Sequence, residues 1–566
     1  MPHKRPDHRP TPKKVRFEKS TGASSKVYVR QLDSHQSEIR LIELYQPQHS
    51  SKFAFKCKLK TVKLYENYSY AAVSYCWGDL TDKVSTFVNR HKVRISKNLH
   101  AALHQLWQSG VLTVWVDFLC INQADDIEKG SQVAIMGKIY SAAQTVYAWL
   151  GPRSFDSDLA MAVPRSERHL AKPELPENPL DSYDAVIRLL SRSYFSRTWI
   201  IQEICLARQV TFICGDRHLP FKTLVRTIED MGDSPAALYA RHLFDPIKTC
   251  RNTARGKAYG YRDSIDTMLA WVIRTRKAQA GDPRDKLYAL ISLAADGHQV
   301  IPAPNYKQSL AQVLADVTTQ IMTYEHLTAV MFLSHRTDGR RKLPSWVPNW
   351  TKMRTEPPAW LEEALYAGRG SLLRGNTVAK ANMVLTVTGI QVDKIIGVMK
   401  PSGGHVPYLH QEPWKSRDVL ERLRMCLMSD QTQAEPQSHL GTWMQSYGQM
   451  EVGSYSIREH LIRYHSEAGS KTSETEDIRE ITREINDLLT YMEQWRMVMA
   501  LGGRHGLQLV YREAMPGDRI FSLERCEVNA ILRREPDGHY KLIGEVLPLP
   551  FIRKGGAARY DDIRIR

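Results

Sequence analysis

Residues 194–207 read Tyr-Phe-Ser-Arg-Thr-Trp-Ile-Ile-Gln-Glu-Ile-Cys-Leu-Ala and predict a helix with an acidic residue on its apolar face. Ser196 is a residue type that favours the N-cap position. Trp199, Glu203 and Leu206 follow at spacings of four and three, so the three side chains share one face. Apolar neighbours raise the pKa of a carboxyl group, which makes Glu203 a candidate for acid–base or electrostatic work.

The same pattern also has a purely structural explanation. A glutamate at the edge of a helix can be held by a nearby arginine, here Arg192 or Arg197, and have no chemical role. Structural ion pairs perturb pKa values as catalytic sites do, so this stretch alone leaves both interpretations open.

The composition is that of a folded protein without a membrane segment. Of the 566 residues, 42% are hydrophobic and 25% are charged, which is ordinary for a globular chain. No run approaches the ~20 apolar residues that a membrane helix needs. The N-terminus also lacks the apolar core of a secretory signal. We therefore expect an intracellular, cytoplasmic protein with no membrane partner.

Eight cysteines are spread along the chain, with no C-x-x-C pair and no Cys/His cluster at zinc spacing. Neither the H-E-x-x-H pattern nor the lysine-containing phosphate-binding loop occurs. This pattern predicts reduced, packed thiols, no metal site and no resident cofactor.

The net charge of +17 is concentrated at the N-terminus. Residues 1–30 hold nine Lys and Arg against two Asp and Glu, a net charge of +7, and the remainder is spread without a dense basic stripe. We therefore do not expect nucleic acid as a partner. Residues 13–16, Lys-Lys-Val-Arg, are a basic cluster of the kind that directs nuclear import, so a nuclear location stays open.

Strand and helix patterns alternate between about residues 68 and 216. Strands are predicted at 70–76, 112–119, 144–150 and 209–214, with Asp117 interrupting the second. Helices are predicted at 98–107, over the stripe from Val133 to Ala143, and at 181–190, and a polar loop at 122–130. This alternation predicts a parallel sheet covered on both faces, with reactive groups beyond the carboxyl ends of the strands.

We predict four segments in the whole chain. Residues 1–25 form a disordered basic tail, 26–216 the α/β domain, 217–380 a mainly helical region, and 381–566 a small antiparallel β unit with a helical insertion at about 405–503. Within the insertion, apolar residues from Ile478 to Met499 repeat at three and four and predict a long helix docked on its own domain. A coiled-coil dimer is the alternative, although the flanking positions lack the expected charge pairs.

Several of these segments resemble the blocks of the fungal heterokaryon-incompatibility (HET) domain. The blocks are 73–78 (Val-Ser-Tyr-Cys-Trp-Gly), 115–123, 132–140, 149–151 (Trp-Leu-Gly) and 194–203. They occur in order and at the spacing of that family, over about residues 68–215. The resemblance implies a TIR-like or flavodoxin-like parallel sheet. It also implies a role in growth arrest or regulated cell death upon nonself recognition, with self-association through this domain or an unidentified protein partner.

The distant kinship with TIR domains implies a chemistry for Glu203. In TIR domains that cleave NAD, a Ser-x-Trp-x-x-x-Glu helix carries the essential glutamate. The spacing from Trp199 to Glu203 is kept here, whereas Ser196 lies one place farther from the tryptophan. The resemblance thus implies NAD(P)+ as substrate, Glu203 as catalytic carboxylate, and as substrate-binding residues Ser74, Tyr75, Trp77, Asp117 and Trp199. A non-catalytic interaction module is the alternative.

Overall fold

The computed structural model describes residues 27–46, 55–66, 68–77, 81–154, 156–162, 179–256, 266–324, 328–336, 343–353, 379–381, 383–398, 451–452, 455–456, 495–500, 507–511, 513–524, 526, 528–546 and 561–566. The chain forms two compact units, Met1–Lys248 with Ala303–Lys307, and Thr249–Pro302 with Gln308–Arg566. The predicted basic tail, 1–25, lies outside the described residues, and the predicted boundaries after 216 and 380 stay predictions.

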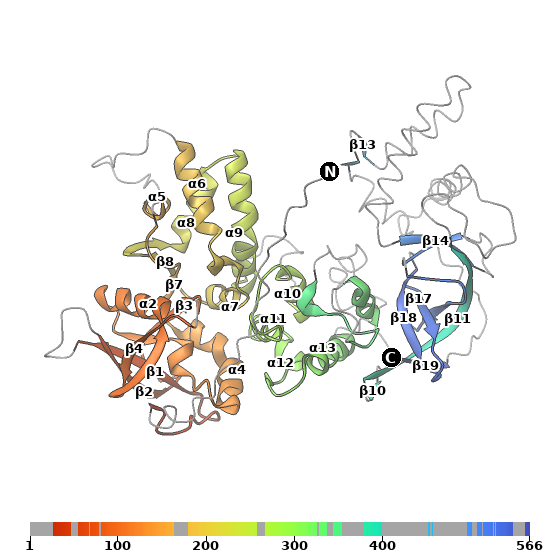
Figure 1. The fold of residues 1–566 in the computed structure, drawn as a ribbon, viewed down its shortest axis with the longest axis horizontal. Helices are drawn as coiled ribbons and strands as arrows, with labels where there is room; N and C mark the ends of the chain where they lie inside the picture. Colours follow the sequence, from red (N-terminus) through yellow and green to blue (C-terminus); the bar gives the residue numbers. More distant parts are fainter. Residues whose placement is uncertain are drawn as a thin grey trace, which may run out of the picture. The chain divides into compact units, whose positions relative to one another are not determined.

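The first unit is built on a nine-stranded sheet with the order β5-β4-β2-β1-β6-β3-β7-β8-β9 (Figure 1). The strands are β1 (Glu38–Tyr45), β2 (Lys56–Lys63), β3 (Ala71–Tyr75), β4 (Lys83–Val88), β5 (His91–Ser96), β6 (Thr113–Trp115), β7 (Val146–Trp149), β8 (Val210–Cys214) and β9 (Arg217–Pro220). The middle strands β6, β3, β7 and β8 pair in parallel. The pairs β1–β2, β1–β6, β4–β5 and β8–β9 are antiparallel.

The sheet is therefore mixed. The predicted parallel strands are confirmed in its middle, where every residue of β3 is buried. A wholly parallel sheet was the wrong expectation, because antiparallel strands extend it on both sides. The TIR-like or flavodoxin-like assignment stays a prediction.

The strand predicted at 112–119 is shorter than expected. Only Thr113–Trp115 is extended, and α3 (Asp117–Cys120) begins two residues later. The carboxylate of Asp117 accepts the backbone N–H of Phe118 at 2.7 Å, a local bond that competes with strand pairing. Asp117 thereby stands just beyond the carboxyl end of β6, at the rim of the sheet.

Two amphipathic helices confirm their predicted apolar stripes. Helix α2 (Lys97–Gln108) buries Leu99, Leu103 and Leu106, and α4 (Asp126–Ala142) buries Val133, Met136, Ile139 and Tyr140. The side chain of Asp125 caps α4 by accepting the N–H groups of Ile127 and Glu128 at 3.0 and 3.1 Å. Because of this cap, the helix starts inside the loop that the sequence predicts at 122–130.

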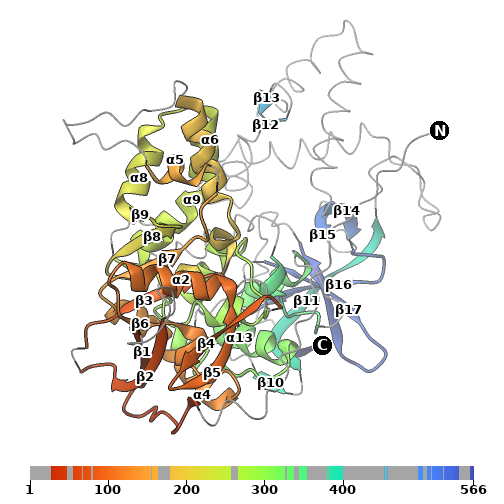
Figure 2. The same ribbon diagram turned by 60° about the vertical axis from the view of Figure 1, so that its left-hand side comes forward.

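The remaining helices of this unit follow β7 in the chain, and α5, α6, α8 and α9 gather at the β8 end of the sheet, away from β2 and β4 (Figures 1 and 2). They are α5 (Ser157–Met161), α6 (Pro179–Leu190), the 3-10 turn η1 (Ser193–Ser196), α7 (Trp199–Cys205), α8 (Phe221–Asp230) and α9 (Pro235–Ala254). Helix α6 begins before its predicted start at 181. Among the described helices, none combines the length and the hydropathy of a bilayer-spanning segment.

A short segment from later in the chain completes the first unit. Residues 303–307 belong to it, and the Nζ atom of Lys129 lies 4.1 Å from the ring centroid of Tyr306. Gly130 faces the carbonyl oxygen of Pro304, and a Cβ atom at this glycine would lie 3.0 Å from that oxygen. A side chain at position 130 would therefore crowd the segment.

The second unit combines helices with a second sheet. Its helices are α10 (Met268–Arg274), α11 (Asp285–Tyr288), α12 (Gly297–Val300) and α13 (Leu310–Tyr324), with 3-10 turns η3 (Thr328–Arg336) and η5 (Trp350–Lys352). Its sheet has the order β15-β14-β11-β16-β17-β18-β19, with β10 on β11. These strands are β10 (Ala379–Ala381), β11 (Val384–Val398), β14 (Trp495–Ala500), β15 (Leu507–Tyr511), β16 (Arg519–Leu523), β17 (Ala530–Arg534), β18 (Tyr540–Glu545) and β19 (Asp561–Ile565), while β12 (Glu451–Val452) and β13 (Tyr455–Ser456) pair separately.

The prediction of a long helix ending at Met499 is wrong in its last part. Residues 495–500 form β14, which pairs with β11 and β15, while 478–494 lie outside the described residues. Trp495 and Met499 are four residues apart, and a separation of four places side chains on one face in a helix and in a strand alike. The spacing therefore could not distinguish the two structures.

The cysteines agree with the expectation of reduced thiols. The seven that the structure describes form no disulfide, and all of them except Cys76 are buried.

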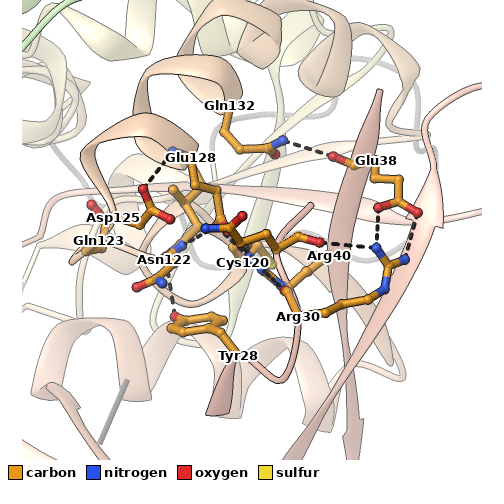
Figure 3. A network of polar contacts seen from close by, with 12 residues as sticks. Tyr28, Arg30, Glu38, Arg40, Cys120, Asn122, Gln123, Asp125, Glu128 and Gln132 are labelled. Atoms are coloured by element: carbon orange, nitrogen blue, oxygen red, sulfur yellow. Dashed lines mark hydrogen bonds and ion pairs between the residues drawn. The ribbon is translucent and has the colours of Figure 1, made fainter. Parts of the chain in front are cut away.

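A buried ion pair fixes the loop that leads from β6 to α4 (Figure 3). Two nitrogens of Arg40 on β1 donate to the carboxylate of Glu128 at 2.6 and 2.9 Å, and the two side chains are 4% and 5% exposed. Arg40 also donates to the carbonyl of Cys120, and Glu128 accepts the backbone N–H of Asn122 at 2.7 Å. The guanidinium lies 4.8 Å from the ring centroid of Tyr28. The pair therefore holds the segment that carries Asp117.

Removing one member of this pair should destabilise the first unit strongly. In Arg40→Met the carboxylate of Glu128 stays buried without its cation, which costs about 3–5 kcal/mol. The double variant Arg40→Met/Glu128→Leu removes both charges and should recover most of that loss. Urea unfolding of the three proteins, followed by circular dichroism, measures both differences. A single variant within about 1 kcal/mol of wild type would contradict this account.

Candidate functional site

Glu203 lies in the interior of the first unit, at the carboxyl end of β3. The residue is 3% exposed. Its Oε2 atom accepts a hydrogen bond from the hydroxyl of Ser74 on β3, and Ser74 Oγ lies 2.6 Å from the hydroxyl of Tyr194. Since Ser74 gives its single proton to the carboxylate, Tyr194 donates to Ser74. The result is a relay of hydroxyl groups from Tyr194 through Ser74 to Glu203.

The surroundings of Glu203 shift its acidity. Burial raises the pKa of Glu203 to about 7, and the charge of Asp117 acts in the same direction. The charge of Arg197 and hydrogen bonds from Ser74 and Tyr140 limit the rise in this pKa. Near neutral pH the carboxyl group is therefore divided between its neutral and ionised forms. Burial also raises the pKa of Tyr194 well above its ordinary value, so its hydroxyl keeps the proton it donates.

The positive charge of Arg197 lowers the pKa of Glu203, although the two side chains form no ion pair. Its guanidinium donates to the backbone carbonyl of Tyr75. Among the described residues Glu203 forms no ion pair, so its oxygens are held by hydroxyl groups alone. Arg192, the other cation considered for this role, instead donates to the carbonyls of Leu150 and Pro152 at 2.9 and 3.2 Å. A carboxylate without a direct ion pair can stabilise a positive charge brought close to it.

Asp117 and Trp77 form the rim of the site. The indole Nε1 of Trp77 donates to Oδ2 of Asp117 at 2.7 Å, and the Trp77 ring meets that of Phe118 edge to face, with centroids 5.6 Å apart. Burial raises the pKa of Asp117, whereas the bond from Trp77 and the charge of Arg197 limit the rise. Both Trp77 and Asp117 are half-buried. The rim thus carries an aromatic ring and a second carboxylate next to Glu203.

The structure brings together five of the six residues that the resemblance implies. Contacts or electrostatic interactions connect Ser74, Tyr75, Trp77, Asp117 and Glu203. Trp199 is half-buried at the start of α7, and among the described residues no hydrogen bond or ring contact joins it to the others.

The predicted N-cap of this helix is wrong. The cap position is Thr198, and the hydroxyl of Ser196 instead donates to the carbonyl of Ser193 within η1. The extra turn η1 precedes α7 and moves Ser196 out of the cap position. It also places Tyr194 against Ser74.

Sequence reasoning missed four residues that shape the site. Tyr194 and Tyr140 reach Ser74 and Glu203 from η1 and α4. Asn98 donates to the carbonyl of Cys76 at 2.7 Å and accepts from the indole of Trp149 at 2.8 Å, so it holds the ends of β3 and β7 together. Tyr194 and Tyr140 lie within HET-like blocks, which is the only sequence signal for their roles, whereas Asn98 lies outside these blocks and had no such signal.

Gln202 is the fourth missed residue. It is 1% exposed, and neither polar atom of its amide has a hydrogen-bond partner among the described residues. Buried amides are nearly always paired, so a ligand or a water molecule could satisfy this side chain. The described residues hold no cluster of three His, Cys, Asp or Glu side chains suited to a metal ion.

Comparison with known proteins shows that the segment containing this site is similar to a described protein family. Residues 70–203 match the family described as Heterokaryon incompatibility protein (HET). The chain is 27% identical to Heterokaryon incompatibility protein 6, OR allele, of Neurospora crassa in an alignment 406 residues long, and the match covers 57% of this chain and 58% of that protein. The similarity thus spans less than two thirds of the relative's length. No solved structure matches the chain. The matched segment begins just before β3 and ends at Glu203, so the part of the chain that matches the HET family contains the buried carboxylate site.

Proposed function

We propose that this protein is an effector of fungal heterokaryon incompatibility, which arrests growth or triggers regulated cell death when nonself is recognised. Support comes from the HET domain at 70–203 and from the relative named for heterokaryon incompatibility. The effector works inside the cell and becomes active by self-association through the HET domain or by binding a protein partner.

The proposed chemistry is hydrolysis of the bond between nicotinamide and ribose in NAD(P)+. When this bond breaks, its electron pair goes to the nicotinamide nitrogen and the ribose becomes an oxocarbenium-like cation. The ionised carboxylate of Glu203 stabilises that cation, and water adds to the sugar and releases a proton. The observation that carries this proposal is a carboxylate held by hydroxyl groups without an ion pair, at the carboxyl end of a central strand.

The rim supplies the proposed binding groups. Trp77 and Tyr75 offer aromatic surface for the nicotinamide ring, and Asp117 offers a second negative charge next to its positive nitrogen. Glu203 is 3% exposed, so the substrate-bound state requires the rim to open. The Trp77–Asp117 hydrogen bond is the contact that opening would break.

A non-catalytic signalling module is the second candidate, and the burial of Glu203 favours it. In this alternative the relay from Tyr194 to Glu203 is a structural network that fixes α7 against β3, and the domain acts by recruiting partners. The two candidates differ in whether the purified protein consumes NAD(P)+.

Replacing Glu203 tests the catalytic proposal. The full-length protein, incubated with NAD+ at a concentration that favours self-association, should release nicotinamide and ADP-ribose in equal amounts. Glu203→Gln keeps the shape and loses the charge, and should lower the rate about 100-fold or more. Glu66→Gln changes a carboxylate that is 53% exposed, and should leave the rate unchanged. Absence of turnover in wild type, together with unchanged toxicity of Glu203→Gln in cells, would favour the signalling module.

The activity should depend on pH through Glu203. Its pKa is about 7, and the ionised form stabilises the sugar cation. The rate of NAD+ cleavage should therefore rise with pH and level off above a midpoint near pH 7. A rate that falls over the same interval would show that the protonated carboxyl is the active form. Chromatographic measurement of nicotinamide between pH 5.5 and 8.5 distinguishes the two.

The same shift predicts a pH-dependent stability. The folded state holds the Glu203 proton up to about pH 7, whereas an unfolded chain releases it near the ordinary value of 4.5. Stability due to this group is therefore complete at low pH and is lost as the pH rises to about 7. Glu203→Gln has no such loss, so at pH 8 it should exceed wild type by up to about 3 kcal/mol. Thermal unfolding at pH 4 and 8 checks this, since the difference should nearly vanish at pH 4, below the ordinary pKa of the carboxyl group.

A further inference from the structure

One face of the sheet collects cations that are scattered in the sequence. In β4 and β5 the register pairs Ser85 with Arg94 and Phe87 with Lys92, so these side chains point to the same side. Cys57 of β2 pairs in parallel with Val88, so both point to the side opposite Phe87. The alternate residues of β2, Lys56, Lys58 and Lys60, therefore point to the same side as Phe87. The cations that share this face are Lys56, Lys58, Lys60, Lys83, Lys92 and Arg94. We call this surface the basic face.

The opposite side of the same strands is part of the core. Cys57, Val88 and Ile95 are at most 1% exposed, and they lie on the side that packs against α2. The five cations other than Lys56 are exposed, and Lys56 is half-buried. The helices α5, α6, α8 and α9 lie at the other end of the sheet in both views (Figures 1 and 2). The basic face therefore lies at the opposite end of the sheet from these four helices.

The positive charge of the basic face is largely uncompensated. Strands β2, β4 and β5 contain no aspartate or glutamate. Glu43, on the neighbouring strand β1, lies opposite Lys58, and its carboxylate is 3.9 Å from Nζ of Lys60. Within the described part of the chain, the four remaining exposed cations form no ion pair. Among the described residues, the carboxylate of Glu43 alone thus faces six cations, which gives this surface a positive potential that attracts anions.

Aromatic rings lie among these cations. Phe87, in the middle of the basic face, is 41% exposed, and Nζ of Lys56 is 5.2 Å from its ring centroid. Tyr68 at the edge is 42% exposed, and Nζ of Lys60 is 4.7 Å from its ring centroid. Exposed rings on a basic sheet face are the arrangement on which unpaired bases stack while cations bind the phosphates.

A protective role against aggregation does not account for the whole surface. Lysines on an edge strand discourage pairing with other chains, and β5 is an edge strand. However, Lys56, Lys58 and Lys60 lie on β2, which pairs with β1 along its whole length and with β4 at Cys57. An internal strand needs no such protection. Its alternating lysines therefore call for another explanation.

We infer that the basic face binds single-stranded nucleic acid. Lys58, Lys60, Lys92 and Arg94 bind phosphates, and a base stacks on Phe87. An anionic membrane is the less favoured ligand, because Phe87 lies within a strand and does not project from a loop or an amphipathic helix as membrane-inserting residues do. This binding is independent of the chemistry proposed for Glu203.

Fluorescence anisotropy of the full-length protein with a labelled 20-nucleotide oligouridylate or oligothymidylate tests this inference. Lys58→Gln/Lys60→Gln/Lys92→Gln should weaken binding roughly tenfold or more and reduce the slope of log Kd against log salt by about 2. Phe87→Ala should weaken binding about tenfold and leave the salt slope unchanged, because stacking releases no counterions.

A charge-matched control is Lys138→Gln/Lys222→Gln/Lys277→Gln, which removes three exposed lysines elsewhere. All variants keep the N-terminal basic residues, so differences between them report on the basic face alone. Equal weakening by both triple variants, or wild-type affinity in the first, would overturn the inference. Binding to vesicles containing phosphatidylserine, without binding to either oligonucleotide, would overturn it as well. Thermal unfolding temperatures verify that the variants are folded.

Discussion

The hydrogen bond from Ser74 to Glu203 connects residues 129 positions apart in the chain. It joins the buried central strand β3 to helix α7 and puts a carboxyl group where water is largely excluded. Such a group is costly to ionise unless neighbouring donors stabilise the charge. Here the donors are hydroxyl groups, and Tyr194 supplies the proton that Ser74 needs in order to donate. The acidity of Glu203 follows from this arrangement.

Two buried glutamates of the first unit, Glu128 and Glu203, have different electrostatic surroundings. Glu128 meets Arg40 in a two-point ion pair and accepts a backbone N–H as well, so its charge is neutralised in place. Glu203 has no such partner among the described residues, and its carboxyl group is only partly ionised near neutral pH. The first arrangement fixes a loop, whereas the second leaves a carboxyl group that changes its charge near neutral pH.

The sequence pattern predicted the central elements of the first unit, because its helices bury one apolar stripe and its central strands are almost continuously apolar. The flanking strands were missed, although β2 alternates lysine with apolar or small residues, which is a strand pattern. The reason is that three lysines in five residues are equally typical of a solvent-exposed charged segment, and only the strand register distinguishes the two. For the site, sequence reasoning identified Glu203 and Asp117 as carboxylates in apolar runs. It could not identify the roles of Tyr194, which contacts Ser74, or of Asn98, which contacts Cys76 and Trp149, because these contacts join separate elements. The spacing near Trp495 fitted two structures equally well.

The segment 303–307 has a consequence for how the HET domain can be isolated. The compact unit is not one continuous stretch of chain, since this segment packs near the start of α4, with Tyr306 beside Lys129. A recombinant truncation at residue 216 or 248 leaves the ring of Tyr306 behind and uncovers the surface around Gly130. Joining residue 248 to this pentapeptide through a flexible glycine–serine linker would restore the missing contact and yield a single-chain version of the domain.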